Sequence, residues 1–201
     1  MTKSIQSAFR SSLRATALCG VLATATFAAF AQSSSDVRFS RNSMVVEHVT
    51  VTSPKPYAAV KKDFETRLGR LDDSIRAELK AGNVDALRAA LTKAAGKDGL
   101  VIHYVGVHGD WLILKGARQN VIEYFIGNIL SAVEMTNANL GAGLYAPLRI
   151  VVYESQRGGT TVEYDRPSTL LSQYHNADVD AMGRSLDERL DRLVASALSG
   201  Q

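Results

Sequence analysis

The chain has 201 residues, with 23 Lys or Arg, 20 Asp or Glu and a formal net charge of +3. The first 31 residues contain three of the basic residues, Lys3, Arg10 and Arg14, and no acidic one. Without that segment, 20 basic and 20 acidic residues remain and the formal charge is zero. Nucleic-acid binding depends on basic patches that neutralise phosphates, so the composition gives no support to a nucleic-acid partner.

The N-terminal segment has the three parts of a secretory signal peptide. The basic residues come first, followed by the apolar stretch Ala15–Ala28 and by Ala29-Phe30-Ala31, an A-x-A cleavage pattern. We therefore predict cleavage after Ala31 and export to the periplasm or the exterior. The apolar stretch is short for a bilayer, so an uncleaved anchor is a weaker alternative and we expect no stable membrane insertion after cleavage. A lipoprotein signal at Cys19 is weaker still.

The exported chain would contain no cysteine, because Cys19 is the single cysteine of the sequence. It would therefore have no disulfide, no thiolate nucleophile and no cysteine metal ligand. Its stability must come from a buried core, and about 170 residues are enough for one such domain. We predict a flexible lead over residues 32–42 and a single domain over residues 43–199.

In the first half of the chain, strand and helix patterns alternate. Ser43–Thr52 is rich in β-branched residues and is predicted as a strand. From Tyr57 to Leu79 apolar residues recur every three or four positions, which predicts helix with a break at Gly69 or Asp72-Asp73. A second amphipathic helix is predicted from Val84 to Ala95. Leu100–Val107 and Trp111–Leu114 are predicted to form an antiparallel hairpin.

In the second half, the predicted elements are the strand Val121–Ile126, the helix Ile129–Met135, the loop Asn137–Gly143, the long strand Leu144–Glu154 and the strand Thr160–Asp165. A short helix over Ser168–Tyr174 and a long one over Ala177–Leu198 follow. This order predicts an α+β fold, a two-layer sandwich in which a mostly antiparallel sheet of about five or six strands packs with helices.

Four segments in order carry a family resemblance: HGDW (His108–Trp111), YFIGN (Tyr124–Asn128), GLYAPLRIVVYE (Gly143–Glu154) and VEYDRPSTLL (Val162–Leu171). With them the chain resembles domain-of-unknown-function family 302 over residues 44–197. The resemblance implies a small α+β sandwich, often a homodimer, mostly bacterial or archaeal, with no established activity. Many relatives have proline where this chain has Ile129, which implies a looser loop if that proline shapes a ligand site.

Gly127-Asn128 stands between a predicted strand and a predicted helix. Free N–H groups at the start of the helix are able to hold a small anion or a carboxylate. Alternatively, Asn128 acts only as the N-cap of the helix. The chain contains neither of the glycine-rich motifs that bind nucleotide phosphates.

Tyr145, Arg149 and Tyr153 alternate within the predicted strand Leu144–Glu154 and would share one face of the sheet. Tyrosine and arginine are typical of interfaces, and Arg149 is suited to hold a carboxylate with two hydrogen bonds. This face is predicted to line a ligand pocket or a dimer interface. In the alternative interpretation Arg149 is buried and paired with an acidic residue of a neighbouring strand (Glu123, Glu163 or Asp165).

Asp165, Arg166 and Pro167 connect the last predicted strand to a helix. We consider Asp165 and Arg166 as ligand-binding candidates and Asp165 as a candidate catalytic carboxylate. Asp165 is also a candidate N-cap, with Pro167 in the first helical turn.

The four histidines, His48, His103, His108 and His175, show no spacing typical of a metal site, so no metal and no cofactor is predicted. No G-x-S-x-G motif and no evident Ser-His-Asp set is present. The first hypothesis is therefore an exported, non-enzymatic, homodimeric domain that binds a small anionic or carboxylate ligand, or a protein. The alternatives are a hydrolase-like or isomerase-like enzyme with Asp165 or His108 as general base, and a purely structural assembly protein.

Overall fold

The computed structural model describes residues 37–199. The predicted signal peptide and the beginning of the lead lie outside these residues. The chain divides into two units, Met1–Arg41 and Asn42–Gln201, and the fold described below belongs to the second. Within the described part, residues 37–47 have no regular secondary structure. No helix of residues 37–199 combines the length and apolar character needed to cross a bilayer.

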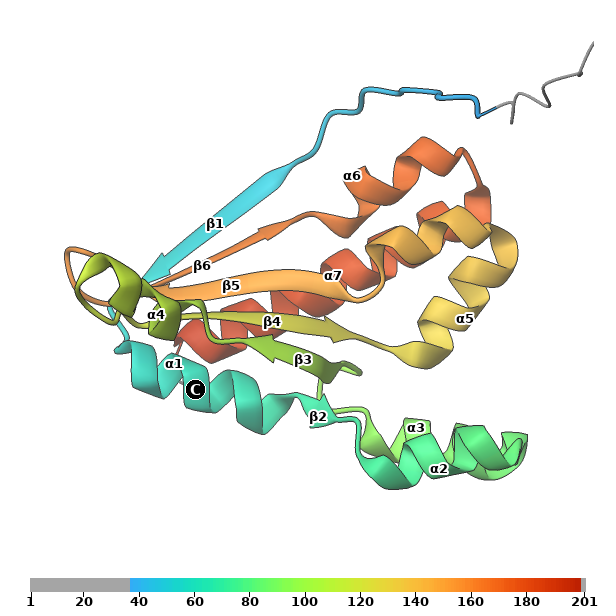
Figure 1. Ribbon diagram of the computed structural model, residues 1–201, viewed down its shortest axis with the longest axis horizontal. Coiled ribbons are helices and arrows are strands. Elements are labelled where there is room, and N and C mark those ends of the chain that lie inside the picture. Colours follow the sequence, from blue (N-terminus) through green and yellow to red (C-terminus); the bar gives the residue numbers. More distant parts are fainter. Residues whose placement is uncertain (1–36, 200–201) are drawn as a thin grey trace, which may run out of the picture. The chain divides into compact units, whose positions relative to one another are not determined.

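Six strands form one mixed sheet in the order β1-β6-β5-β4-β3-β2 (Figure 1). Their bounds are β1 His48–Ser53, β2 Gly69–Arg70, β3 Val101–Gly106, β4 Val121–Gly127, β5 Leu148–Glu154 and β6 Thr160–Asp165. Neighbours pair antiparallel except β2 and β3, which are parallel. The predicted α+β fold with a mostly antiparallel sheet is confirmed.

The helices are α1 Tyr57–Arg67, α2 Asp73–Ala81, α3 Val84–Ala94, α4 His108–Trp111, α5 Ile129–Ala138, α6 Pro167–Leu171 and α7 Ala177–Ser199, with 3-10 turns η1 Leu112–Lys115, η2 Leu140–Tyr145 and η3 Ser172–Tyr174. The predicted break in the first helical pattern is confirmed, because β2 separates α1 from α2. The side chain of Asp72 accepts the N–H of Ile75 and caps α2. Helices α2 and α3 project beyond the β2 edge (Figure 1).

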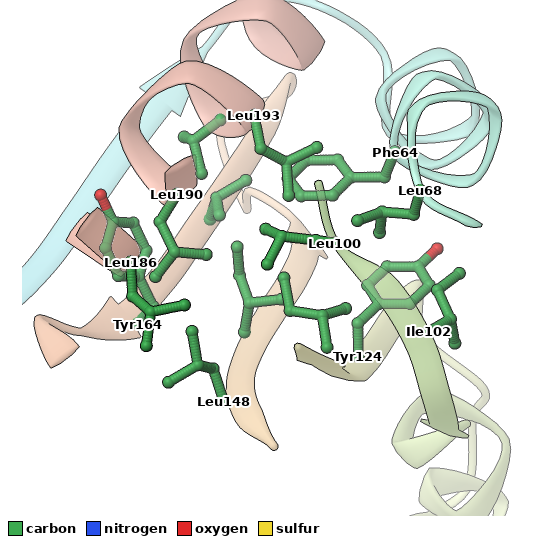
Figure 2. Close-up of a cluster of buried hydrophobic side chains, with 14 of the residues drawn as sticks. Phe64, Leu68, Leu100, Ile102, Tyr124, Leu148, Tyr164, Leu186, Leu190 and Leu193 are labelled. Carbon is green, nitrogen blue, oxygen red and sulfur yellow. The ribbon is translucent and has the colours of Figure 1, made fainter. Parts of the chain in front are cut away.

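The core lies between one face of the sheet and helices α1 and α7 (Figure 2). From α7, Leu190 and Leu193 are almost fully buried against the sheet. Phe64 of α1 stacks on Tyr124 of β4 with a centroid distance of 5.9 Å and an interplanar angle of 3°. Each such side chain contributes roughly 1.5–3 kcal/mol of burial free energy, which fixes α1 and α7 on the sheet.

The other face of β4, β5 and β6 is called the open face here and carries Glu123, Phe125, Arg149, Val151, Tyr153, Glu163 and Asp165. All of these residues are exposed or half-buried, whereas their neighbours in each strand are largely buried. The alternation follows from the two-residue period of a strand. The open face is therefore polar and aromatic, in contrast to the aliphatic core face.

The predicted hairpin of Leu100–Val107 with Trp111–Leu114 is wrong. Residues 108–115 form α4 and η1, and β3 pairs with β4 instead. A side chain at Gly109 would lie 1.9 Å from the backbone oxygen of Gln119, so only glycine permits this close return of the chain. A short apolar run is compatible with either helix or strand. Here α4 packs closely against the backbone just before β4, and this contact favours the helix.

Three further predictions need correction. The first strand begins at His48 rather than Ser43, and the helix after Asn128 continues to Ala138 rather than Met135. The predicted loop Asn137–Gly143 ends in a 3-10 turn, started by the side chain of Asn139, which accepts the N–H of Gly141 at 2.9 Å.

The long strand predicted from Leu144 begins only at Leu148. Tyr145 ends η2 and is followed by a cis peptide bond between Ala146 and Pro147. Tyr145 therefore does not share a strand face with Arg149 and Tyr153, as the sequence predicted, although the latter two do share the open face.

Candidate functional site

Two hollows border the segment Tyr145–Leu148. The smaller cavity, of about 120 Å³, is lined by His103, Gly127, Asn128, Ser131, Ala132, Met135, Tyr145, Ala146, Pro147, Leu148 and Leu186. The larger hollow, of about 490 Å³, is lined by Phe125, Leu144, Tyr145, Ala146, Pro147, Leu148, Arg149, Asp165 and Leu170. The structure thus gathers five of the six candidate site residues, all except Arg166, around one segment.

The wall between the hollows is held by tyrosine contacts. The Oη of Tyr145 accepts a hydrogen bond of 2.8 Å from the side-chain amide of Gln173. Its ring meets the ring of Tyr174 edge-on, with centroids 6.3 Å apart. Tyr174 in turn donates a 2.6 Å hydrogen bond to the carbonyl of Gly141. These contacts tie η2 to η3 and fix the position of Tyr145.

Arg149 lies on the open face at the larger hollow and is exposed. In the sheet it stands opposite Phe125, which stands opposite Tyr104. The Tyr104 and Phe125 rings are 5.5 Å apart in an edge-on arrangement. Within residues 37–199 Arg149 has neither an ion pair nor a side-chain hydrogen bond, so the interpretation of a buried, paired Arg149 is wrong.

Asp165 does not cap the helix that follows it. The N-cap of α6 is Arg166, without a side-chain cap bond, while Pro167 occupies the first turn as predicted. The Oδ1 of Asp165 instead lies 2.8 Å from Nδ1 of His48. This hydrogen bond raises the pKa of His48, with Glu163 adding to the effect from 3.4 Å on the other ring nitrogen. The imidazole of His48 thus occupies one carboxylate oxygen of Asp165, which lines the larger hollow together with Arg149.

Arg166 points away from both hollows into an acidic group. Its guanidinium lies 3.2 Å from Asp187, 3.3 Å from Asp191 and 3.6 Å from Glu47. Asp187 is 6% exposed and also accepts the N–H of Ser168 at 3.0 Å. Arg166 therefore ties the start of α6 to α7, and its charge is already shared among three carboxylates.

Asn128 caps α5, as one of the two interpretations predicted. Its Oδ1 accepts the N–H of Ser131 at 3.0 Å and its Nδ2 donates to the carbonyl of Gly99 at 2.8 Å. The cap uses an N–H group that an anion at the helix start would need. Gly127 and Asn128 nevertheless line the smaller cavity.

His103 lines the smaller cavity and was not selected as a site residue from the sequence. The pairing of β3 with β4 slips between Ile102 and Tyr104, which leaves His103 as an extra residue, a β-bulge. Bulges re-aim a side chain, and here the imidazole turns to the cavity. Burial, followed by the charge of Arg76, lowers the pKa of His103. A bulge leaves no signature in a single sequence, so no signal marked this residue.

His108 belongs to neither hollow. Its Nε2 lies 2.7 Å from Oε2 of Glu123 on the open face. Of the two residues considered as general base, Asp165 lines the larger hollow and His108 lines neither of the two hollows. Among residues 37–199 no three His, Cys, Asp or Glu side chains gather as a metal site would require.

The structure is thus a small α+β sandwich with two hollows around the segment Tyr145–Leu148. The model of the family described as "Domain of unknown function DUF302" matches residues 75–197, and the chain belongs to this family. The solved structure of an uncharacterized conserved DUF302 protein from Bacillus stearothermophilus has the same fold, with a TM-score of 0.51 and 17% identity. The alignment covers 73% of this chain and 94% of that one. No curated protein matches the chain.

Proposed function

We propose that this protein is a non-enzymatic binding domain whose larger hollow takes a small amphipathic carboxylate. The observation that carries the proposal is Arg149, an arginine without an ion-pair partner among the described residues that borders a hollow of about 490 Å³. Arginine binds a carboxylate through two parallel hydrogen bonds. A hollow of this size is within the usual range for small-molecule sites.

The other residues that line the larger hollow indicate which further chemical groups the ligand should carry. Phe125, Leu144 and Leu170 supply apolar surface beside Arg149. Asp165 would repel a carboxylate, but its hydrogen bond with His48 offsets that charge. A ligand with one carboxylate and a short apolar body matches this combination, whereas a dianion or a purely apolar molecule leaves one part of the hollow without a partner.

Octanoate is a suitable probe, with octanol as the uncharged analogue. Titration calorimetry should show 1:1 binding of octanoate, and Arg149→Gln should weaken it by about ten- to a hundredfold, because a charge-assisted hydrogen bond is worth about 1.5–3 kcal/mol. Arg157→Gln is the matched control, since Arg157 is an exposed arginine on the β5–β6 turn. Equal affinity of octanoate for the parent and Arg149→Gln, or no binding to the parent, would refute the proposal.

We further propose that the exported protein is a homodimer that buries part of the open face against a second copy. Support comes from Tyr104 of β3, which stands opposite Phe125 of the open face, is 64% exposed and meets the Phe125 ring edge-on. Aromatic side chains and arginine are enriched at interfaces. Export rests on the signal-peptide pattern of the sequence.

Sedimentation equilibrium tests the dimer. Tyr104→Ser should shift the protein towards monomer, whereas Leu79→Ser should not, because Leu79 is 65% exposed on α2, away from the open face. A monomeric parent protein, or equal dissociation in both variants, would contradict the dimer without affecting the octanoate experiment. N-terminal sequencing of the exported protein tests cleavage after Ala31.

A further inference from the structure

We propose that the smaller cavity is a separate binding site for a small uncharged molecule, about the size of one six-membered ring, that forms a hydrogen bond with the imidazole of His103. The proposal does not depend on the carboxylate site. It rests on the cavity, on the bulge that places His103 in its wall, and on the absence of any charged side chain from that wall.

The other polar side chains of the wall are already engaged. Both ends of the Asn128 amide are used, by Gly99 and by the start of α5. The Oη of Tyr145 is bonded to Gln173, and Oγ of Ser131 lies 3.4 Å from the guanidinium of Arg189. Within the described part of the chain, the ring of His103 has no hydrogen-bond partner, so it is the group that a ligand would satisfy.

Gly127 keeps the space beside the imidazole open. A Cβ at this position would lie 3.4 Å from Nε2 of His103 and 3.8 Å from Pro147. Any side chain larger than alanine would therefore extend into the cavity. Because Gly127 has no side chain, the end of β4 leaves room next to the imidazole of His103.

The wall selects the chemical class of the ligand. Met135, Leu148 and Leu186 are buried apolar side chains, and an apolar cavity of roughly 150 Å³ is known to accept benzene. Burial disfavours the charged form of His103, so the ring offers one donor and one acceptor rather than a cation. No charged side chain lines this wall, so a carboxylate or an ammonium group would lose its hydration without gaining an ionic partner in the wall.

Three fluorinated probes separate the contributions of the hydrogen bond, the apolar contact and the ligand's charge. ¹⁹F NMR titration should show saturable 1:1 binding of 4-fluorophenol, about five- to tenfold weaker binding of fluorobenzene, and no binding of 4-fluorobenzoate at this site, because one neutral hydrogen bond contributes about 1 kcal/mol. The ¹⁵N signals of His103 should shift with 4-fluorophenol in the same titration.

The variants test location and anchor separately. His103→Leu should lower 4-fluorophenol affinity to that of fluorobenzene, and Ala132→Phe, which fills the cavity, should abolish the binding of both. His175→Asn is the matched control, since His175 is exposed with a φ of 49° that asparagine tolerates. The proposal would be overturned by unchanged 4-fluorophenol affinity in His103→Leu, by a lack of 4-fluorophenol binding to the parent, or by His103 signals that do not respond. The last two measurements use the parent protein and therefore do not require Ala132→Phe to fold.

Discussion

His48 on the edge strand β1 and Asp165 on β6 stand directly opposite each other in the sheet, with their side chains 2.8 Å apart. This pair lies beside the larger hollow and joins the first strand of the domain to the last. Its hydrogen bond raises the pKa of His48, which makes the attachment of β1 sensitive to pH near neutrality.

The first prediction concerns His48→Gln. The folded protein holds the proton of His48 more tightly than the unfolded chain, so the extra stability is fully present below about pH 6.5 and disappears as the pH rises through the raised pKa. Thermal melting should therefore show the parent more stable than the variant in mild acid, with the difference vanishing in mild alkali. A difference that grows with pH would contradict the assignment.

His103 should have the opposite pH dependence. Its pKa is lowered in the folded protein, so the unfolded chain takes up the proton first and stability falls as the pH drops below about 6.5. Urea unfolding at about pH 7.5 and about pH 5 should show a smaller acid loss in His103→Leu than in the parent. An equal acid loss in both proteins would mean that His103 is protonated in the folded state.

Asn128→Ala should destabilise the protein by about 2 kcal/mol. It removes the cap of α5, worth about 1 kcal/mol, and leaves the carbonyl of Gly99 without its donor. Asn83→Ala is the comparison, because Asn83 caps α3 through the N–H of Ala86 alone and should lose about 1 kcal/mol or less. Urea unfolding measures both, and equal losses would show that the Gly99 bond contributes nothing.

Leu190→Ala should reduce the free energy of unfolding by about 2–5 kcal/mol, because Leu190 is 1% exposed and its removal leaves a cavity between α7 and the sheet. Leu79→Ala, at a position that is 65% exposed, should change stability by less than about 0.5 kcal/mol. Guanidinium unfolding gives both values. A small effect at Leu190 would mean that α7 packs more loosely than described.

The sequence predicted most of the elements because their hydrophobic periods are clear. The predicted long helix is confirmed as α7, in which Leu186, Leu190 and Leu193 are buried, and the predicted strand Thr160–Asp165 is confirmed as β6. The two-residue strand β2 was missed, since two residues carry no period. Its place depends on the packing of Gly69, where a Cβ would lie 1.6 Å from the carbonyl oxygen of Ala94.

The candidate site was predicted in part. Gly127 and Asn128 border the smaller cavity, Arg149 and Asp165 border the larger hollow, and Tyr145 borders both. The role of Asp165 as a cap was wrong, because the hydrogen bond to His48 spans 117 positions and long-range pairs leave no local pattern. The bulge at His103 depends on the pairing with β4, which the incorrect hairpin concealed.

The bulge in β3 has a second effect, on self-association. Only the first two residues of β3 pair with β2, so Tyr104, Val105 and Gly106 continue along the margin of the sheet. A bulge twists an edge strand and interrupts the regular spacing of its free N–H and C=O groups. Another chain therefore pairs poorly with such an edge. The extra residue, His103, thus makes this margin a poor site for fibril growth, and we expect deletion of His103 to increase aggregation along it.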